Sequence, residues 1–357
     1  MTSVLFRSAD LKDLENIHQL ALSSGIGVTS LSKDLKVLQE RLQRSTASFK
    51  KLVTKPHSEF YLFVIEDLNT NKVVGTSAVE AMTGHDVPLY SYKLSNRTRI
   101  CNSLKLRTDY EVLYMVNDNQ NSSELCTLYL DEHYRQKDYS ALLARGRFLY
   151  MANFPQRFAN LIIAEMRGMC DVNGNSPFWD AIGSHFFNMS FAEADRLTLS
   201  TNKQFIADLM PRNPVYVKLL SKEAQQVIGQ PHTSTIPAMR ILNRDGFRYN
   251  NYVDIFDAGP TLEAIRDKIL SITASRVLTV KNLSDEVEGS NYLVSNTQPD
   301  IRATLSSAIL NQHHNSCILS KQTAEVINVK VGEPVRIVPL NIEQTNVFTK
   351  SDHEPSK

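Results

Sequence analysis

The sequence predicts an α+β fold, in which a mixed sheet flanked by helices is followed by a small β-rich, barrel-like module. Three observations lead to this prediction. Two amphipathic segments come near the start of the chain, a strand–turn–helix–strand unit lies in its centre, and five short β-rich segments follow residue 275. We expect a main domain over residues 1–275, the module over 276–342 and a polar, disordered tail over 343–357.

The first elements are a short strand and two helices. SVLFRSAD predicts the strand, and residues 11–24 and 32–49 predict helices, because leucines recur on one side while charges occupy the other. FYLFVIED is a continuous apolar run typical of a buried strand. The segment VVGTSAVEAM is its expected hairpin partner across the turn LNTNK.

The centre of the chain holds the strand ELCTLYL, the turn RQKDYS at residues 135–140 and a helix over 139–154. Another strand at 159–168 and a helix at 176–187, begun by Ser-Pro, come next. The strands expected in the C-terminal module span residues 276–283, 291–296, 302–310, 316–320 and 334–340.

Composition excludes several classes of function. Lys and Arg total 39 against 38 Asp and Glu, so no overall basic charge favours nucleic acid. No apolar run is long enough to span a bilayer, and the first residues lack the apolar core of a signal peptide. The four cysteines lack CxxC spacing, and no His/Cys/Asp cluster has metal-ligand spacing. We therefore expect a cytoplasmic protein that binds no nucleic acid, membrane or metal.

The order of two helices, a hairpin, a central strand, a helix and a further strand resembles the GNAT-type acyl-CoA N-acyltransferases. The resemblance implies that the central strand splays from its neighbour and that its unpaired backbone groups bind the acyl donor in the gap. It places Leu128, Tyr129 and Leu130 at this edge, where backbone N–H groups would hold the carbonyl oxyanion. The following turn would bind the pyrophosphate, because a helix N-terminus favours anions.

Longer blocks resemble the arginine N-succinyltransferase family. They are NSSELCTLYLDEHYR, LIIAEMRGMCDVNGNSPFWDAIGSHFFNMSFAEAD, FIADLMPRNPVY, EAQQVIGQPH and GFRYNNYVDIFDAGPTLE. The resemblance covers most of residues 1–275 and implies a β-rich C-terminal module. It also implies transfer of succinyl from succinyl-CoA to the α-amino group of L-arginine. Some members of the family act on ornithine as well. The implied assembly is a homo-oligomer or a heteromer with a related subunit.

Two residues are candidates for proton transfer. His232 lies in the loop GQPHTSTIPA, and a single histidine in a loop is more often a surface residue than a catalytic one. It matches the family's GQ-x-H motif, which implies a proton donor, and imidazole titrates near neutral pH. Glu124 opens the central strand and either accepts the proton of the substrate ammonium or is a strand-end carboxylate that contacts water or the guanidinium. Leu128 matches the family's backbone contact to succinyl-CoA, which is compatible with core packing of its side chain.

Arginine as a substrate requires carboxylates around its guanidinium and a cation or N–H pair for its carboxylate. Arg167 is a candidate for the second role, or for binding the succinyl carboxylate. An internal salt bridge is the alternative for such charged residues in strands. The candidates for the guanidinium are Asp118, Glu165, Asp254 and Asp257.

The turn at residues 135–140 departs from the family pattern. Glycine lets a backbone approach phosphate closely, but here Asp138 and Ser140 occupy the expected glycine positions. Arg135 and Lys137 remain as cations, and Ser140 can cap the helix or bond a phosphate. Asp138 must point away from a bound pyrophosphate, because like charges repel. The departure leaves open a catalytically weakened paralogue or partner subunit. An acyltransferase for another amine, such as ornithine, is a separate alternative.

Overall fold

The computed structural model describes residues 3–24, 31–135, 138–171, 174–200, 204–311 and 313–342. Within these ranges the strands form one continuous sheet in the order β12-β15-β11-β14-β13-β1-β2-β3-β6-β7-β10-β9-β4-β5-β8. The expected tail at 343–357 lies outside the described residues. The strands of the main body are β1 (Val4–Ser8), β2 (Phe60–Asp67), β3 (Lys72–Glu80), β4 (Ser91–Cys101), β5 (Leu106–Val116), β6 (Ser123–Leu130), β7 (Leu161–Glu165), β8 (Val215–Tyr216), β9 (Arg248–Val253) and β10 (Pro260–Ile265).

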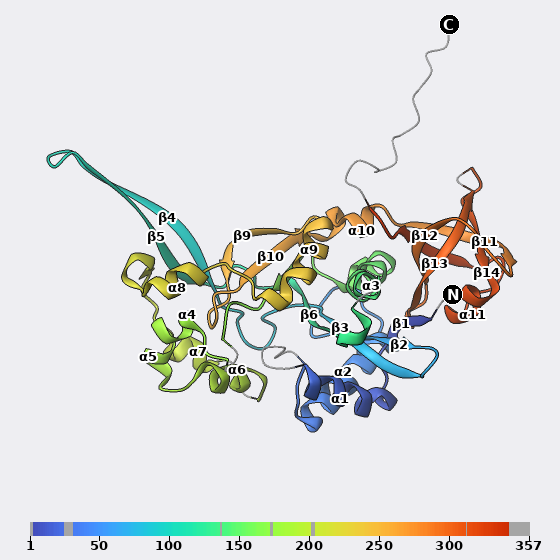
Figure 1. Cartoon of the computed structure of the whole chain (residues 1–357), viewed down its shortest axis with the longest axis horizontal. Helices are drawn as coiled ribbons and strands as arrows, with labels where there is room; N and C mark the ends of the chain where they lie inside the picture. Colours follow the sequence, from blue (N-terminus) through green and yellow to red (C-terminus); the bar gives the residue numbers. More distant parts are fainter. Residues whose placement is uncertain are drawn as a thin grey trace, which may run out of the picture.

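Helices cover this sheet along its length, as Figure 1 shows. The predicted helices near the start of the chain are confirmed as α1 and α2, and the one behind the central strand as α3. The helices are α1 (Leu14–Ser23), α2 (Leu35–Lys50), α3 (Tyr139–Asn153), α4 (Pro177–Ala181), α5 (Ser184–Phe187), α6 (Phe191–Ser200), α7 (Gln204–Leu209), α8 (Lys222–Val227), α9 (Ile236–Arg244), α10 (Leu270–Thr273) and α11 (Lys321–Val326).

Strand β2 lies between two apolar clusters. Phe60 and Leu62 pack with the leucines of α1 and α2, whereas Tyr61 and Phe63 pack with α3 on the opposite face. Alternate residues of a strand point to opposite faces, so burial on both sides requires the continuous apolar run seen in the sequence. Each of these side chains contributes about 1.5–3 kcal/mol through burial. The core therefore holds β3 and β6, the next strands of the sheet, at a fixed position.

The segment predicted as one helix over residues 176–187 forms two short helices, α4 and α5. The chain leaves helical geometry at Ile182, whose φ and ψ are −130° and −73°. At the next residue a Cβ on Gly183 would lie 2.3 Å from the indole of Trp179, so the backbone there rests directly on that buried ring. The break follows from this close packing.

The five predicted C-terminal strands form a closed barrel. Strand β12 pairs with β15 on one side and with β13 on the other, which completes the ring β12-β15-β11-β14-β13. Short helix α11, which the sequence analysis did not predict, covers it, and β13 joins it to the main sheet by pairing with β1. The barrel strands are β11 (Arg276–Ser284), β12 (Ser290–Asn296), β13 (Arg302–Asn311), β14 (Ser316–Ser320) and β15 (Pro334–Pro339).

Helix α3 is fixed between the sheet and this barrel. Arg145 is buried and donates to the backbone oxygens of Leu340 and Pro339 and to the hydroxyl of Ser271. A Cβ on Gly146 would lie 2.8 Å from the ring of Phe6, so glycine allows the helix to rest directly on β1. The positions of the next residues on α3 are therefore tightly determined.

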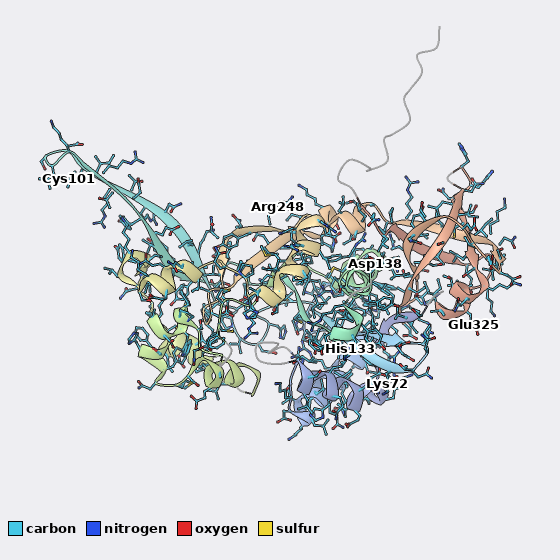
Figure 2. All side chains as sticks on the ribbon, viewed as in Figure 1. Lys72, Cys101, His133, Asp138, Arg248 and Glu325 are labelled. Atoms are coloured by element: carbon cyan, nitrogen blue, oxygen red, sulfur yellow. The ribbon has the colours of Figure 1, made fainter. Side chains whose placement is uncertain are left out.

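Strands β4 and β5 form a long hairpin that projects from the body in Figure 1, with Cys101 near its tip in Figure 2. Eleven residue pairs connect the two strands. Nothing in the sequence of these two strands indicates that they form a projecting arm. Among the described residues, no helix has both the length and the apolar character needed to cross a membrane.

Candidate active site

A cavity of about 220 Å³ lies where β6 and β7 separate. The two strands are parallel and pair only at Ser123–Ile162 and Glu124–Ile163 within the described chain. Strand β7 continues alongside β10, whereas β6 continues alongside β3. Beyond Glu124, the edge of β6 that faces the cavity therefore forms no ladder with β7 in the described chain. The resemblance to the GNAT-type N-acyltransferases implied this separation of the two strands.

A β-bulge in β6 shapes the wall of this cavity. Register with β3 shifts between Thr76 and Ala78, and Thr127 takes a positive φ of 56°. A threonine at positive φ is strained, and such strain persists only where neighbours enforce it. Here the hydroxyl of Thr76 donates to the Thr127 carbonyl oxygen at 2.9 Å. Leu128, directly after the bulge, is half-buried and lines the cavity.

The two other candidate residues of β6 have different surroundings. The Tyr129 hydroxyl lies 3.2 Å from the hydroxyl of Ser23 at the end of α1, so this ring points away from the cavity. Leu130 is buried in the apolar cluster beneath α3. Only their backbone groups can serve an acyl donor, and neither side chain lines the cavity.

The start of α3 follows β6 through the glycine-free turn. Arg135 folds back, donates from Nε to the Leu130 carbonyl oxygen at 2.9 Å and lies over the ring of Tyr129. Asp138, labelled in Figure 2, is the exposed N-cap of α3. Its side chain makes no capping bond within the described residues. Ser140 is half-buried in the first turn. Lys137 lies outside the described residues. A helix N-terminus at this position favours an anion.

His232 lies on the loop that enters α9, and this loop is fixed to the end of β7. Its main-chain N–H donates to the Arg167 carbonyl oxygen at 2.8 Å, and the preceding Pro231 forms a bridge with Gly168. The ring Nδ1 lies 2.7 Å from the Ser234 hydroxyl and accepts the Ser234 N–H at 3.2 Å. Because an N–H only donates, Nδ1 is an acceptor and the neutral ring carries its hydrogen on Nε2.

The environment of His232 favours the neutral ring. Burial, and after it the positive charge of Arg167, lower the pKa of His232 below its usual value of 6.5. The imidazole itself is half-buried beside the cavity, whose lining includes Arg167 and, from the same turn as His232, Thr235.

Most of the predicted substrate-binding residues converge on the cavity. Glu124, Glu165, Asp254 and Asp257 all line it. Asp257 is buried and accepts the backbone N–H groups of Gly168 and Gly259, so it also holds the end of β7 in place. Asp254 accepts two backbone N–H groups of its own turn.

Asp118 does not line this cavity. It accepts the Tyr252 hydroxyl at 2.8 Å and lies 4.0 Å from the Nζ atom of Lys93, on the side of the sheet near β4. Arg167, by contrast, lines the cavity and donates to the sulfur of Cys170.

Comparison with known proteins agrees with this geometry. The family described as "Arginine N-succinyltransferase beta subunit" matches residues 4–271, and its C-terminal domain matches residues 276–339. The arginine N-succinyltransferase of Enterobacter sp. (strain 638) is 40% identical over 344 residues, which cover 96% of this chain and 99% of that protein. That of Yersinia pseudotuberculosis serotype O:3 (strain YPIII) is 39% identical over 347 residues, covering 95% and 98%. The chain belongs to the arginine N-succinyltransferase family.

A solved structure of a relative supports the same assignment. Subunit AI of the arginine/ornithine succinyltransferase from Pseudomonas aeruginosa superposes with a TM-score of 0.87 and 36% identity, covering 96% of this chain and all of that one. The family resemblance seen in the sequence blocks is thus confirmed, together with its acyltransferase fold.

Several cavity residues of this family member were not identified from sequence. Phe191 and Phe256 form apolar walls, and Thr235 and Ala238 contribute from the segment after His232. The fully buried Arg147 of α3 also reaches the cavity. The sequence showed two arginines on this helix but contained no signal that one faces a binding site. Within the described residues, no three His, Cys, Asp or Glu side chains gather in a way that could hold a metal ion.

Proposed function

We propose that this chain transfers the succinyl group of succinyl-CoA to the α-amino group of L-arginine. The observation that carries the proposal is the cavity between β6 and β7, because it adjoins the part of β6 beyond the ladder with β7, several carboxylates and the His232 loop. Two parts of the chain are suited to bind an acyl-CoA. They are the edge of β6 after the bulge and the N-terminus of α3, whose dipole favours the phosphates.

The transfer is a direct attack of the amine on the thioester. The substrate ammonium first gives a proton to Glu124, at the point where β6 and β7 part. The C–N bond then forms, backbone N–H groups at Leu128 stabilise the oxyanion, and the C–S bond breaks. His232 donates the hydrogen on Nε2 to the departing CoA sulfur. The second proton of the adduct nitrogen reaches Nδ1 of His232 through solvent as Nε2 donates, so the ring stays neutral. Glu124 then gives its proton to solvent, so one proton goes to the CoA sulfur and one is released in each turnover.

The other charged side chains of the cavity are suited to bind the amine substrate. Arg167 adjoins His232 through its own backbone oxygen, so its guanidinium suits the α-carboxylate, which shares a carbon with the reacting amine. Carboxylates of Glu165, Asp254 and Asp257 line the same cavity and suit the substrate guanidinium. Ornithine is a second candidate amine, because the P. aeruginosa relative is named as an arginine/ornithine enzyme. That relative is also named as a subunit, and we propose an assembly here too, with a second copy or a related subunit.

Calorimetric titration followed by a thiol-release assay tests the proposal. We expect succinyl-CoA to bind, and arginine to give faster CoA release than ornithine, with lysine slowest. No binding at millimolar succinyl-CoA would refute the enzyme assignment and favour a catalytically inactive partner subunit. Faster release with ornithine than with arginine would correct the substrate alone.

A further inference from the structure

Arg147 is a buried cation at the wall of the active-site cavity. Only 1% of the surface of Arg147 is exposed to solvent, yet this residue lines the cavity from the middle of α3. The Nε atom donates to the Ala144 carbonyl oxygen at 3.0 Å, and Nη1 lies 3.4 Å from the Ala78 carbonyl oxygen. These two contacts occupy two of the five N–H donors of a guanidinium. The other donors remain for a ligand.

Among the described residues no carboxylate lies within 4.0 Å of the Arg147 guanidinium, although the more distant charge of Asp245 raises its pKa. Burial lowers the pKa of Arg147 to about 10, so the side chain is still protonated at neutral pH. Burial also raises the pKa of Cys126, the neighbouring thiol, to about 12, so that group is neutral. The direct ion pair of Asp245 is with Arg145, at 3.7 Å.

A protonated, buried guanidinium with no carboxylate in contact is costly unless a ligand supplies the negative charge. A carboxylate is the natural match, because its two oxygens can accept from two guanidinium N–H groups at once. From its place in the cavity, we infer that Arg147 binds the distal carboxylate of the succinyl group and thereby selects a dicarboxylic acyl donor. This inference rests on the proposed function, since it names the acyl subsite of the same cavity.

Two carboxylates enter such a reaction, and their chemistry distinguishes them. The α-carboxylate of the amine substrate shares a carbon with the reacting nitrogen, so its partner must lie near the proton-transfer groups. Arg167, whose backbone oxygen accepts the N–H of His232, meets that condition. The succinyl carboxylate is separated from the reacting carbonyl by two methylene groups. It therefore needs a cation deeper in the cavity, and Arg147 is fully buried whereas Arg167 is half-buried.

The test compares three acyl donors with the wild-type protein and with Arg147→Gln. Succinyl-CoA carries the distal carboxylate, succinamoyl-CoA replaces it with an uncharged amide of similar shape, and butyryl-CoA has a methyl group instead. For the wild type we expect kcat/KM to be about 100-fold lower with succinamoyl-CoA than with succinyl-CoA. For Arg147→Gln we expect that ratio to fall to within a few-fold of one, through loss of succinyl-CoA activity. A wild type that uses both donors equally, or a variant with an unchanged ratio, overturns the inference.

Arg167→Gln is the matched control, because it removes a cation from the same cavity. We expect it to lower turnover of all three donors by the same factor and to raise the KM for arginine. If Arg147 instead binds the arginine carboxylate, Arg147→Gln will produce this pattern and the inference fails. If Arg147→Gln does not fold, Arg147→Lys and the wild-type comparison of donors decide. Failure of the proposed function is distinct: no acyl-CoA would then release CoA with arginine.

Discussion

The main-chain N–H of His232 donates to the carbonyl oxygen of Arg167 at 2.8 Å. This bond and the bridge between Pro231 and Gly168 attach the histidine loop to the end of β7. A loop residue distant in sequence is thereby placed beside the cavity with its ring oriented by Ser234. The bond joins the backbones of His232 and Arg167, and the first two predictions concern these residues.

Replacing His232 with Ala removes the proposed proton donor. General acid–base groups contribute about 10²–10⁴-fold, so we expect kcat to fall by at least about 100-fold with little change in the Kd for succinyl-CoA. Steady-state kinetics and calorimetry measure the two quantities. Ser234→Ala is the control, since it keeps the imidazole and removes one ring contact, and it should cost about tenfold or less. An unchanged rate in His232→Ala removes the residue from the mechanism.

The pKa of His232 should respond to the charge of Arg167. Burial and the adjacent guanidinium both lower this pKa, so NMR titration of the ring should give a value below 6.5 in the free protein. Arg167→Gln removes a positive charge that disfavours the imidazolium, and the pKa should therefore rise. Arg240→Gln, which removes an exposed charge on the neighbouring α9, should leave it unchanged. A pKa insensitive to Arg167 would contradict this coupling.

The hydroxyl of Thr76 should matter for donor binding as well as stability. Thr76→Val keeps the shape but loses the bond to the Thr127 carbonyl oxygen, at a cost of about 1 kcal/mol in the free energy of unfolding. The bulge then relaxes, and the KM for succinyl-CoA should rise. Ser77→Ala loses a comparable buried bond, from its hydroxyl to the Leu143 carbonyl oxygen at 3.0 Å, away from the bulge. Equal KM values in both variants would show that the bulge does not position the donor.

Asp138 is expected to weaken binding of the donor's phosphates. It is an exposed acid at the N-terminus of α3, where a bound anion would experience repulsion. Asp138→Asn should lower the Kd for CoA about two- to fivefold, and the gain should diminish with added salt. Glu325→Gln removes one charge from the distant barrel and should have no effect (Figure 2). Unchanged CoA affinity in Asp138→Asn at low salt would place the phosphates elsewhere.

Arg145 should stabilise the contact between α3 and the barrel. Its guanidinium is buried, bonds the Leu340 and Pro339 carbonyl oxygens and pairs with Asp245. Arg145→Met leaves that carboxylate buried without its partner, which should lower the free energy of unfolding by about 3–5 kcal/mol. Arg107→Gln breaks only an exposed pair on the hairpin and should change stability by less than about 1 kcal/mol. Chemical denaturation monitored by circular dichroism measures both values.

Apolar patterns in the sequence correctly predicted the elements whose position depends on neighbouring residues in the chain. The apolar run of β2, the leucine spacing of α2 and the short C-terminal strands each lie where predicted. Helix α3 behaves differently, because it is buried on nearly all sides between sheet and barrel. Such a helix has no polar face, so periodicity does not distinguish Arg145, which fixes the barrel, from Arg147, which faces the cavity. That distinction depends on contacts between segments far apart in the chain.

The sequence also predicted part of the candidate site, but not all of it. The family resemblance predicted His232 and Leu128, and the position at the start of the central strand predicted Glu124. Glu124 and Leu128 line the cavity, and the roles of all three residues stay predictions. Asp118 lies near β4 instead, because the sheet places the loop before β6 beside Tyr252. The walls formed by Phe191 and Phe256 come from segments whose aromatic residues are indistinguishable from core residues in the sequence.

Identification of the reaction product tests the central claim most directly. Purified protein is incubated with succinyl-CoA and L-arginine, and the product is analysed by mass spectrometry and NMR. Succinylation of the α-amino group, with one CoA released per arginine consumed and loss of both in His232→Ala, is the predicted result. Absence of a succinylated product despite binding of succinyl-CoA, or succinylation at the guanidinium, would contradict it.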